Sequence, residues 1–509
     1  MKIFTGAQIR QIDGYTIEYE PINSINLMER ASIAIMQAFV SLYSANCPVF
    51  IFAGPGNNGG DGIALARHLG LLGYNVKVYI LKSENYSPDN LINIQRLGDQ
   101  GVVNLSYVES PSDFPQISKN GILVDSLFGS GLTRSLSGVA KQLVDYLNDQ
   151  KADRVAIDIP SGLFTESNPC PNENSVFRAD LTITIQFPKL SFFFPENDQY
   201  VGKWNVVDIG LHPQAICEIS SPYFLADNEY VFDKLPRRNK FDHKGLRGHC
   251  LIIAGSHGMC GAAIISAKSC LMAGAGLVSV HVPQSGLSIV QQALPEAIVV
   301  TDTDLHFFTD SNLDKKYNAI AIGPGLGTHK RTIEGFRRFL QKVHCPLVID
   351  ADGLNIIAHV PELMELVPQN TIITPHVGEF NRLFGETNSG YGRLALAQEF
   401  ATKYSIIIIL KGAHTQIVCP SGQVYFNSTG NSAMATAGSG DSLTGIIVSL
   451  LGQGLKPINA AVLGVYLHGK AADLALDAKG GGSIIAGDIS NALSLALGCF
   501  NSKFTKKHT

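Results

Sequence analysis

A glycine-rich turn late in the chain places an aspartate where it could take part in phosphoryl transfer. Residues Thr436–Gly445 read TAGSGDSLTG and precede an apolar stretch with helical character. Glycines expose backbone N–H groups at a helix start, where the helix dipole favours negative charge on a transferred phosphoryl group. Asp441 follows these amides directly and could accept a proton from an attacking hydroxyl. An ordinary glycine-rich helix entry is the alternative, and the motifs around the turn disfavour it.

Those motifs stand at the ends of apolar runs in the second half of the chain. KGAHT, at Lys411–Thr415, follows IIIIL and offers a cation and loop amides to a nucleotide. His376 lies in TPHVGEF beside Pro375 and Gly378–Glu379, so we expect it to contact a ligand, although a lone histidine is more often structural. The remaining motifs are GSHGMCGAA at Gly255–Ala263, GPGLG at Gly323–Gly327 and DADGLN at Asp350–Asn355.

The first half of the chain has its own glycine-rich turn after an apolar run. VFIFA is followed by GPGNNGGDG, from Gly54 to Gly62, and then by the helical pattern IALARHLGLLG. Exposed amides at such a helix start form a site for a phosphate. The spacing is neither GxGxxG nor a Walker loop, and a plain strand-to-helix turn is the alternative. The two asparagines and the aspartate in the run favour a binding site.

Two carboxylates follow other apolar runs in this half. Asp125 ends ILVD and precedes a second glycine-rich loop at Gly129–Ser135, and Asp158 ends RVAID and precedes Ser161. A single strand-end aspartate is as often a helix cap as a functional residue. In a parallel sheet, however, the three strand ends would converge on one rim, which makes a site the better interpretation.

Short apolar runs alternate with amphipathic stretches through both halves, which predicts α/β domains with parallel sheets. Ile406–Ile409, four consecutive isoleucines, predicts a strand covered on both faces, although periodicity alone does not exclude a buried helix. The pattern falters between residues 211 and 245, so we place a domain boundary around 216–226. The expected strands are Pro48–Ala53, Val76–Leu81, Ile122–Leu127, Arg154–Ile159, Leu181–Phe187, His249–Ala254, Leu277–Val282, Ala319–Ile322, Leu347–Asp350, Thr371–Thr374, Ser405–Leu410 and Thr415–Val418.

The composition of the chain argues against nucleic-acid and membrane partners. The chain has 509 residues, a formal net charge of -4 and one tryptophan, with no basic stripe, so we expect no nucleic-acid partner. There is no signal-peptide pattern and no apolar segment of the roughly 20 residues that span a bilayer, so we expect no membrane partner. Nine scattered cysteines without a CxxC pair indicate free thiols and a cytoplasmic location. The polar end, NSKFTKKHT, predicts a frayed tail.

GNNGGDG, D-x-L-x-G-[TS]-G and D-I-P-S-G, in this order, resemble the N-terminal domain of the bifunctional NAD(P)H-hydrate repair enzymes. The resemblance implies a Rossmann-like three-layer α/β/α domain at residues 1–215, an epimerase that interconverts the R and S hydrates at C6 of the nicotinamide ring. It further implies K⁺ bound by Asn58, Asp125 and Ser161, and Asp158 at the hydrated ring. The implied dinucleotide site comprises Asn57, Asn58, Gly59, Gly60, Asp61, Gly129, Ser130, Gly131, Leu132, Thr133, Arg134 and Ser135.

The motifs of the second half resemble the ribokinase-like ADP- or ATP-dependent NAD(P)H-hydrate dehydratases, which implies such a domain at residues 226–500. GSGD replaces the commoner kinase turn GAGD, as in the dehydratases, and DADGLN departs from the expected DADALN only at Gly353. The resemblance implies Mg²⁺ together with ADP or ATP. The implied contacts to the nucleotide are Lys411, Gly412, Ala413, His414, Thr415 and Gly440, and those to the hydrate are Ala262, Gly325, His376 and Asp441.

The resemblance leads to two mechanistic hypotheses for substrates NADHX and NADPHX, the hydrated forms of NADH and NADPH. Asp158 would donate a proton to the departing C6 hydroxyl, and water would return from the other face. Asp441 would take the proton of the C6 hydroxyl as the terminal phosphoryl group transfers to it. A small-molecule kinase with an accessory domain, or a scaffold protein, remains open as an alternative. Homo-oligomerisation is also possible.

Overall fold

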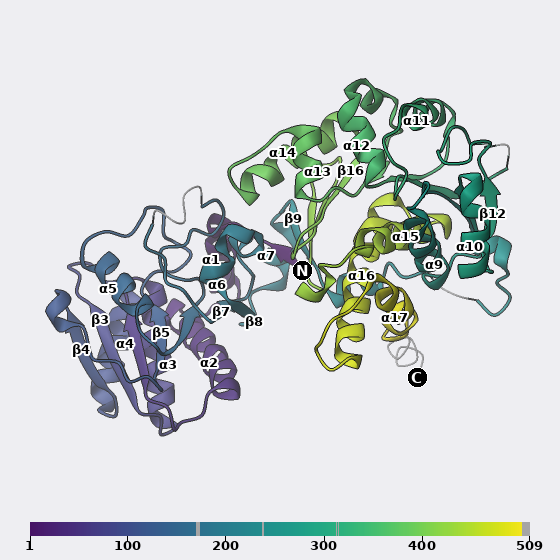
Figure 1. The fold of residues 1–509 in the computed structure, drawn as a ribbon. Helices are drawn as coiled ribbons and strands as arrows, with labels where there is room; N and C mark the ends of the chain where they lie inside the picture. The colour runs from purple at the N-terminus through teal and green to yellow at the C-terminus, as the bar shows by residue number, and fades with distance from the viewer. Residues whose placement is uncertain (169–173, 237–238, 312, 314, 501–509) are drawn as a thin grey trace. The chain divides into compact units, whose positions relative to one another are not determined.

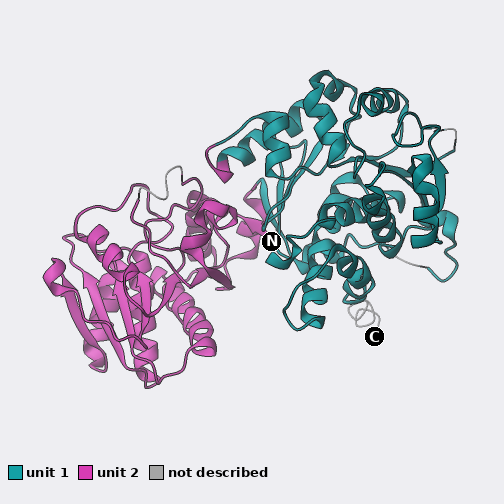
Figure 2. Cartoon of the chain, viewed as in Figure 1, with its two compact units in different colours: residues 1, 222–387, 392–509 teal, residues 2–221, 388–391 magenta. Residues whose placement is uncertain are grey.

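The computed structural model describes the chain apart from residues 169–173, 237–238, 312, 314 and 501–509, so the polar tail lies outside the described residues. The chain forms two compact units (Figure 2). The N-terminal unit comprises residues 2–221 and 388–391, and the C-terminal unit comprises residues 1, 222–387 and 392–509. The main passage from one to the other therefore falls between residues 221 and 222.

The N-terminal unit is built on a seven-stranded parallel sheet in the order β4-β3-β2-β5-β6-β7-β8. Its elements are β1 (Lys2–Ile3), α1 (Gly6–Tyr19), α2 (Ser24–Leu42), β2 (Val49–Ala53), α3 (Asn57–Leu71), β3 (Val76–Leu81), α4 (Pro88–Gln100), β4 (Asn104–Val108), β5 (Ile122–Ser126), α5 (Gly138–Asn148), β6 (Asp153–Ile157), β7 (Leu181–Ile185), α6 (Asp198–Val201), β8 (Lys203–Val207) and α7 (Pro213–Glu218).

Helices cover both faces of this sheet, because successive strand residues point to opposite sides. On one face, Val49 and Ile51 of β2 pack with Ile63 of α3 and residues of α2 and α4. On the other face, Phe50 and Phe52 pack against α5. The result is the expected three-layer α/β/α arrangement (Figure 1).

The C-terminal unit is a second α/β fold, with strands in the order β9-β18-β17-β16-β15-β14-β13-β10-β11-β12. Its elements are β9 (Tyr223–Ala226), α8 (Asn228–Phe232), β10 (His249–Ile253), α9 (Cys260–Met272), β11 (Leu277–Val282), α10 (Leu287–Ala293), β12 (Ile298–Thr301), β13 (Ala319–Ile322), α11 (Lys330–Lys342), β14 (Leu347–Ile349), α12 (Asp352–His359), β15 (Ile372–Ile373), α13 (Val377–Phe384), α14 (Gly390–Tyr404), β16 (Ile407–Leu410), β17 (Gln416–Val418), β18 (Val424–Asn427), α15 (Ser439–Gly452), α16 (Pro457–Ala478) and α17 (Ala486–Gly498).

The core of this unit lies on both sides of the sheet. Helices α9, α15, α16 and α17 share one apolar cluster with alternate residues of the central strands. Helices α11 to α13 lie on the other side of the sheet (Figure 1). The isoleucine-rich strand β16 is buried along its whole length, as the sequence predicted.

One expectation about this sheet is wrong. The run Thr415–Val418 was expected to form a parallel strand, but β17 is antiparallel to both β16 and β18. Only the loop at residues 411–415 separates β16 from β17, and a connection that short permits a hairpin but no parallel crossover. Among the described helices, none combines the length and the apolar character that crossing a membrane requires.

Candidate active sites

The glycine-rich turn of the N-terminal unit joins β2 to α3. The helix begins at Asn57 after Gly56, which contributes no side-chain cap. The side chain of buried Asn90 supports the turn, because its amide donates to the carbonyls of Gly54 at 2.8 Å and Gly56 at 2.7 Å. Gly54 has to be a glycine, since a Cβ there would lie 1.7 Å from the carbonyl oxygen of Leu127.

The predicted K⁺ ligands Asn58, Asp125 and Ser161 lie at the carboxyl ends of β2, β5 and β6, which are neighbours in the sheet as expected. Asp125 accepts hydrogen bonds from the Ser161 amide at 2.8 Å and the Ser161 hydroxyl at 2.6 Å. Burial nevertheless raises the pKa of Asp125 to about 6. Both side-chain polar atoms of Asn58 are buried and have no partner in the described structure. An unpaired amide oxygen and a buried carboxylate are groups that suit a hard cation.

Asp158 follows β6 and is paired with a lysine that the sequence analysis missed. Lys189 has 1% of its side chain exposed and donates to Asp158 Oδ1 at 2.5 Å. The ammonium group also donates to the Thr184 hydroxyl and the Phe187 carbonyl, so its charge is well satisfied. Asp158 has a φ of 67°, the left-handed region that aspartate and asparagine tolerate better than most residues. Because Lys189 ends the strand-like run LTITIQFPK, its position after a strand is the signal that could have identified it.

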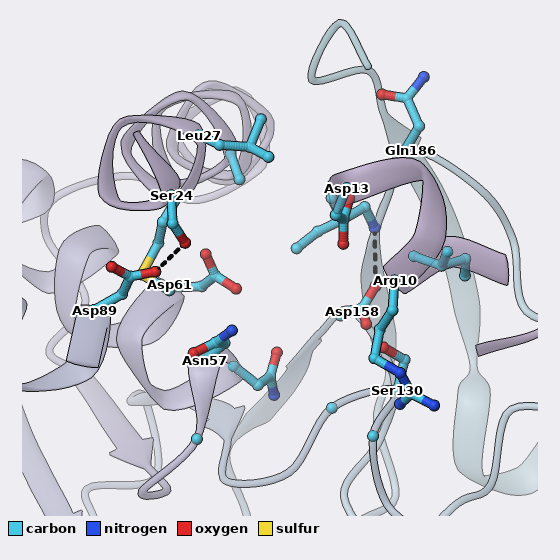
Figure 3. Close-up of a pocket in the computed structure, with 18 of the residues that line it drawn as sticks. Arg10, Asp13, Ser24, Leu27, Asn57, Asp61, Asp89, Ser130, Asp158 and Gln186 are labelled. Carbon is cyan, nitrogen blue, oxygen red and sulfur yellow. Dashed lines mark hydrogen bonds between the residues drawn. The ribbon is translucent and has the colours of Figure 1, made fainter. Parts of the chain in front are cut away.

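A cavity of about 530 Å³ opens above these strand ends (Figure 3). It brings together Asn57, Asn58, Asp61, Asp158 and part of the second glycine-rich loop, Gly129–Leu132. The remaining predicted dinucleotide residues do not line it. Gly59 and Gly60 are buried in the turn, and Thr133, Arg134 and Ser135 are exposed beyond the cavity.

Besides the predicted Asp61, the cavity contains a carboxylate that the sequence did not suggest, Asp13. Asp13 projects from α1, which precedes the first strand of the sheet, and no local motif marks it. Burial, together with the charge of Asp158, raises the pKa of Asp13 to about 6. Burial also raises the pKa of Asp61 well above its usual range, and Asp158 and Asp13 add to the effect.

In the C-terminal unit, the TAGSGDSLTG turn forms the start of α15. Gly438 caps the helix with a φ of 84°, and Asp441 lies half-buried in the first turn. The amides of Gly440 and Asp441 have no acceptor within the described part of the chain, although the Ser439 amide donates to the Thr436 carbonyl. Burial, with the charge of Asp350 adding to it, raises the pKa of Asp441 to about 6. The turn therefore combines free main-chain donors with a carboxylate that titrates near neutrality.

Lys411 lies beside this turn and is held by an aspartate of the DADGLN motif. Its ammonium group is 3.0 Å from Asp350 Oδ1 and 3.7 Å from Glu379 Oε2. Thr444 of α15 donates to the other Asp350 oxygen at 2.8 Å. Burial opposes ionisation of Asp350, but Lys411 and Thr444 outweigh it and lower its pKa. A Cβ placed on Gly440 would lie 3.4 Å from Lys411 Nζ, so the cation adjoins the free amides.

The other predicted dehydratase residues lie in loops or helix starts that follow strands. Residues Lys411–Thr415 link β16 to β17, and the Thr415 hydroxyl closes this loop onto the Gly412 carbonyl. Ala262 and Gly325 approach each other closely, since a Cβ on Gly325 would lie 3.0 Å from that of Ala262. His376 caps α13, its Nδ1 accepting from the Gly378 and Glu379 amides, while most of its ring is exposed. The capping bond gives His376 a structural task besides the predicted ligand contact.

Within the described residues, no group of three or more His, Cys, Asp or Glu side chains is arranged to hold a metal ion. The eight cysteines in the described part of the chain are free, and Cys250, Cys260, Cys270 and Cys419 are buried. Cys217 and Cys499 are exposed.

Known proteins resemble both units. A family model described as NAD(P)H-hydrate dehydratase matches residues 250–494, and one described as YjeF-related protein N-terminus matches residues 24–191. A solved ADP/ATP-dependent NAD(P)H-hydrate dehydratase from Bacillus subtilis, co-crystallised with ATP and Mg²⁺, is 31% identical. The match covers 54% of this chain and 98% of that one, with a TM-score of 0.49. The expected pair of folds, Rossmann-like and then ribokinase-like, is confirmed.

Full-length relatives share both units in the same order. The bifunctional NAD(P)H-hydrate repair enzyme Nnr of Moorella thermoacetica is 35% identical over 517 residues, covering 98% of this chain and 97% of that protein. The protein of the same name from Escherichia coli is 33% identical over 480 residues, covering 92% and 88%. The chain thus belongs to the family of bifunctional NAD(P)H-hydrate repair enzymes.

Proposed function

We propose that this protein repairs hydrated NADH and NADPH in two reactions. The N-terminal unit interconverts the R and S hydrates, and the C-terminal unit dehydrates the S hydrate to NADH or NADPH at the expense of ADP or ATP. The observation that supports this best is the start of α15. There a carboxylate with a raised pKa adjoins the free amides of Gly440 and Asp441 and the ammonium group of Lys411.

The dehydration turns a poor leaving group into a good one. Asp441 accepts the proton of the C6 hydroxyl while the terminal phosphoryl group of the nucleotide transfers to that oxygen. The amides at the start of α15 and Lys411 stabilise the charge that develops on the phosphoryl oxygens. The C6–O bond then breaks, phosphate leaves and a proton is lost from C5, which restores the dihydropyridine ring.

Magnesium would arrive with the nucleotide, whose phosphates it neutralises. Mg²⁺ usually keeps several waters and takes only one or two protein carboxylates, and this suits a site without a cluster of acidic ligands. Of the carboxylates present, Asp350 and Glu379 are already engaged by Lys411, so they position that lysine. The nucleotide-binding residues remain those predicted, Lys411–Thr415 and Gly440.

In the epimerase site, Asp158 faces the hydrated ring and exchanges a proton with the C6 hydroxyl. The sequence-based hypothesis made Asp158 the initial proton donor. The buried ion pair with Lys189 stabilises its charged form, so we assign it first the role of proton acceptor. The ring nitrogen lone pair stabilises the cation that remains when the hydroxyl departs. The predicted dinucleotide residues that line the cavity would hold the rest of the substrate, and Thr133, Arg134 and Ser135 would contact it where it extends beyond the cavity.

Potassium would be held by Asn58, Asp125 and Ser161. The unpaired Asn58 amide oxygen and the buried Asp125 carboxylate provide the oxygen atoms that such a cation requires. The charge of the potassium ion would compensate that of Asp125. Asp125 in turn orders the loop after β5, because it accepts a hydrogen bond from the Leu127 amide.

The location and the partners of the protein are proposed from its residues as well. The eight free cysteines of the described residues favour the reducing environment of the cytoplasm. The substrates are the hydrates and the nucleotide, with no nucleic-acid or membrane partner, and self-association of the ribokinase-like unit is proposed as well.

The dehydratase assignment is tested by mixing the purified protein with S-NADHX, Mg²⁺ and ADP or ATP and recording the NADH absorbance. Asp441→Ala is expected to abolish the nucleotide-dependent recovery of NADH, because the proton acceptor is lost. Asp158→Asn serves as the reciprocal control and is expected to dehydrate the S hydrate at the wild-type rate. A kinase for another substrate would produce no NADH in the wild type, and turnover by Asp441→Ala would remove Asp441 from the mechanism.

A further inference from the structure

The epimerase cavity has carboxylates on two facing walls (Figure 3). Asp158 and Asp13 lie on one wall, with Arg10 and Ser130 beside them. Asp61 projects from α3 on the other wall, and its carboxyl group points into the space between them. Only 8% of Asp61 is exposed, and its carboxyl group has no hydrogen-bond partner among the described residues. A buried, unpaired carboxyl group aimed into a ligand cavity requires a partner that the ligand would supply.

The two walls differ in the charge that they favour. Asp158 is hydrogen-bonded to the ammonium group of Lys189, which stabilises a carboxylate. Asp61 has no cation within hydrogen-bond reach among the described residues, and the groups whose charges raise its pKa are all acidic: Asp158 and Asp13 on the opposite wall and Asp89 on its own wall. Burial and these neighbours raise the pKa of Asp61 well above its usual range, so that the protonated acid is the favoured form.

Inversion at C6 requires proton transfer on both faces of the ring. The hydroxyl leaves from one face with a proton, and water adds to the opposite face and loses one. A single rigid carboxyl group on one side of the substrate reaches only one of these faces. We propose that Asp61 is the second catalytic residue of the epimerase, acting on the face opposite Asp158; this rests on the epimerase activity proposed above.

The two aspartates and water account for every proton that is transferred in the epimerisation, and the ring nitrogen supplies the electron pair. Protonated Asp61 donates its proton to the C6 hydroxyl, the C6–O bond breaks, and the ring nitrogen supplies the electron pair that forms the iminium ion. Water then bonds to C6 from the Asp158 side, and the Asp158 carboxylate accepts the proton released. In the reverse direction Asp158 donates and Asp61 accepts, so the pair serves both hydrates without another reactant.

The other carboxylates of the cavity are less suited to this role. Asp89, on the same wall as Asp61, is hydrogen-bonded to the Ser24 hydroxyl. Asp13 lies on the Asp158 wall, where the charge of Lys189 partly offsets the rise in its pKa. Asp61 is therefore the carboxyl group that is both unpaired and opposite Asp158.

The test uses the full-length protein and the isosteric variant Asp61→Asn, with R-NADHX supplied and S-NADHX formation followed after subtraction of the rate without protein. We expect kcat for epimerisation to fall by at least about 100-fold, the usual scale of general acid–base catalysis. KM is expected to change little, because the amide keeps the shape of the cavity. Asp89→Asn is the matched control on the same wall, and its loss is expected to be at least about tenfold smaller.

Two further measurements separate a chemical role from other causes. Titration with unhydrated NADPH is expected to give the same affinity for Asp61→Asn as for the wild type. Dehydration of S-NADHX with ATP by the same preparation reports on the integrity of the remainder of the chain. Retention of most of the epimerase rate, or loss of NADPH binding together with the rate, would overturn the proposal. An inactive wild type would instead refute the epimerase function itself.

Discussion

Two aspartates at the dehydratase site show how surroundings divide roles between identical side chains. Asp350 is fully buried, yet Lys411 and Thr444 satisfy both of its oxygens and keep its pKa low. Asp441 has no such partners, and burial raises its pKa to about 6. Asp350 therefore stays charged and positions Lys411, while Asp441 can gain and lose a proton near neutral pH.

This difference predicts an acidic limb in the pH profile of dehydration. Asp441 must be ionised to accept a proton, so kcat/KM for the S hydrate should be constant well above pH 6 and fall about tenfold per unit below it. With the ordinary pKa of 3.8, the fall would begin about two units lower. Nucleotide affinity would be measured at each pH, so that an effect of phosphate protonation on binding can be separated from the effect of Asp441 protonation. A profile that is flat down to pH 5 would contradict this assignment.

At the level of single residues, the sequence revealed the groups within motifs and missed those outside them. Asp158 and Asp441 stand in DIPSG and GSGD, and the structure places both at the ends or beginnings of elements that line a site. Lys189, by contrast, is 31 positions from Asp158, and Asp13 precedes every strand of the main sheet. Their proximity to Asp158 arises from the order of strands and helices in space, which no local pattern of residues reports.

At the level of elements, most of the buried strands were predicted, although the buried strand β18 was not, and the edge strands were missed. The runs predicted as Val76–Leu81, Leu277–Val282 and Ala319–Ile322 have those bounds in the structure. The strands β4 and β8 were missed, because they form the two edges of their sheet and NLSYV and KWNVV are partly exposed. An edge strand has polar residues facing solvent, so it lacks the continuous apolar run of a central parallel strand.

The turn after β2 is the element on which the epimerase site depends most. A Cβ at Gly54 would lie 1.7 Å from the Leu127 carbonyl oxygen, which belongs to backbone that cannot easily move aside. Gly54→Ala is therefore expected to abolish epimerisation while S-NADHX dehydration persists. Gly98→Ala in α4 is the control, because a Cβ there meets open space, and an alanine stabilises a helix by up to about 1 kcal/mol. Both activities and thermal unfolding would be measured, and wild-type epimerisation by Gly54→Ala would contradict the prediction.

At the level of the whole molecule, each site is lined by residues of a single unit. The cavity residues named above belong to the unit of residues 2–221, and the predicted dehydratase residues, from Ala262 to Asp441, belong to the other. Each unit also has its own apolar clusters.

Self-contained sites predict that two inactive chains can complement each other. Asp158→Asn is expected to lack epimerase activity and Asp441→Ala to lack dehydratase activity, so neither alone should convert R-NADHX into NADH with ATP beyond the spontaneous rate. An equal mixture is expected to restore the conversion, because the S hydrate released by one chain can diffuse to the other. NADH absorbance follows the reaction. A mixture no faster than either variant would show that the intermediate is passed within one chain.

The unusual backbone angle of Asp158 also governs how mutants at this position are to be interpreted. Asparagine tolerates a φ of 67° at least as well as aspartate, so Asp158→Asn leaves the main chain in place and removes only the negative charge. An alanine has no short polar group to stabilise this conformation, so the peptide would tend to rotate, and the contact with Lys189 would be lost together with the carboxylate. The two substitutions would then lower the rate for different reasons. Only Asp158→Asn would report the effect of the negative charge without a change in backbone geometry.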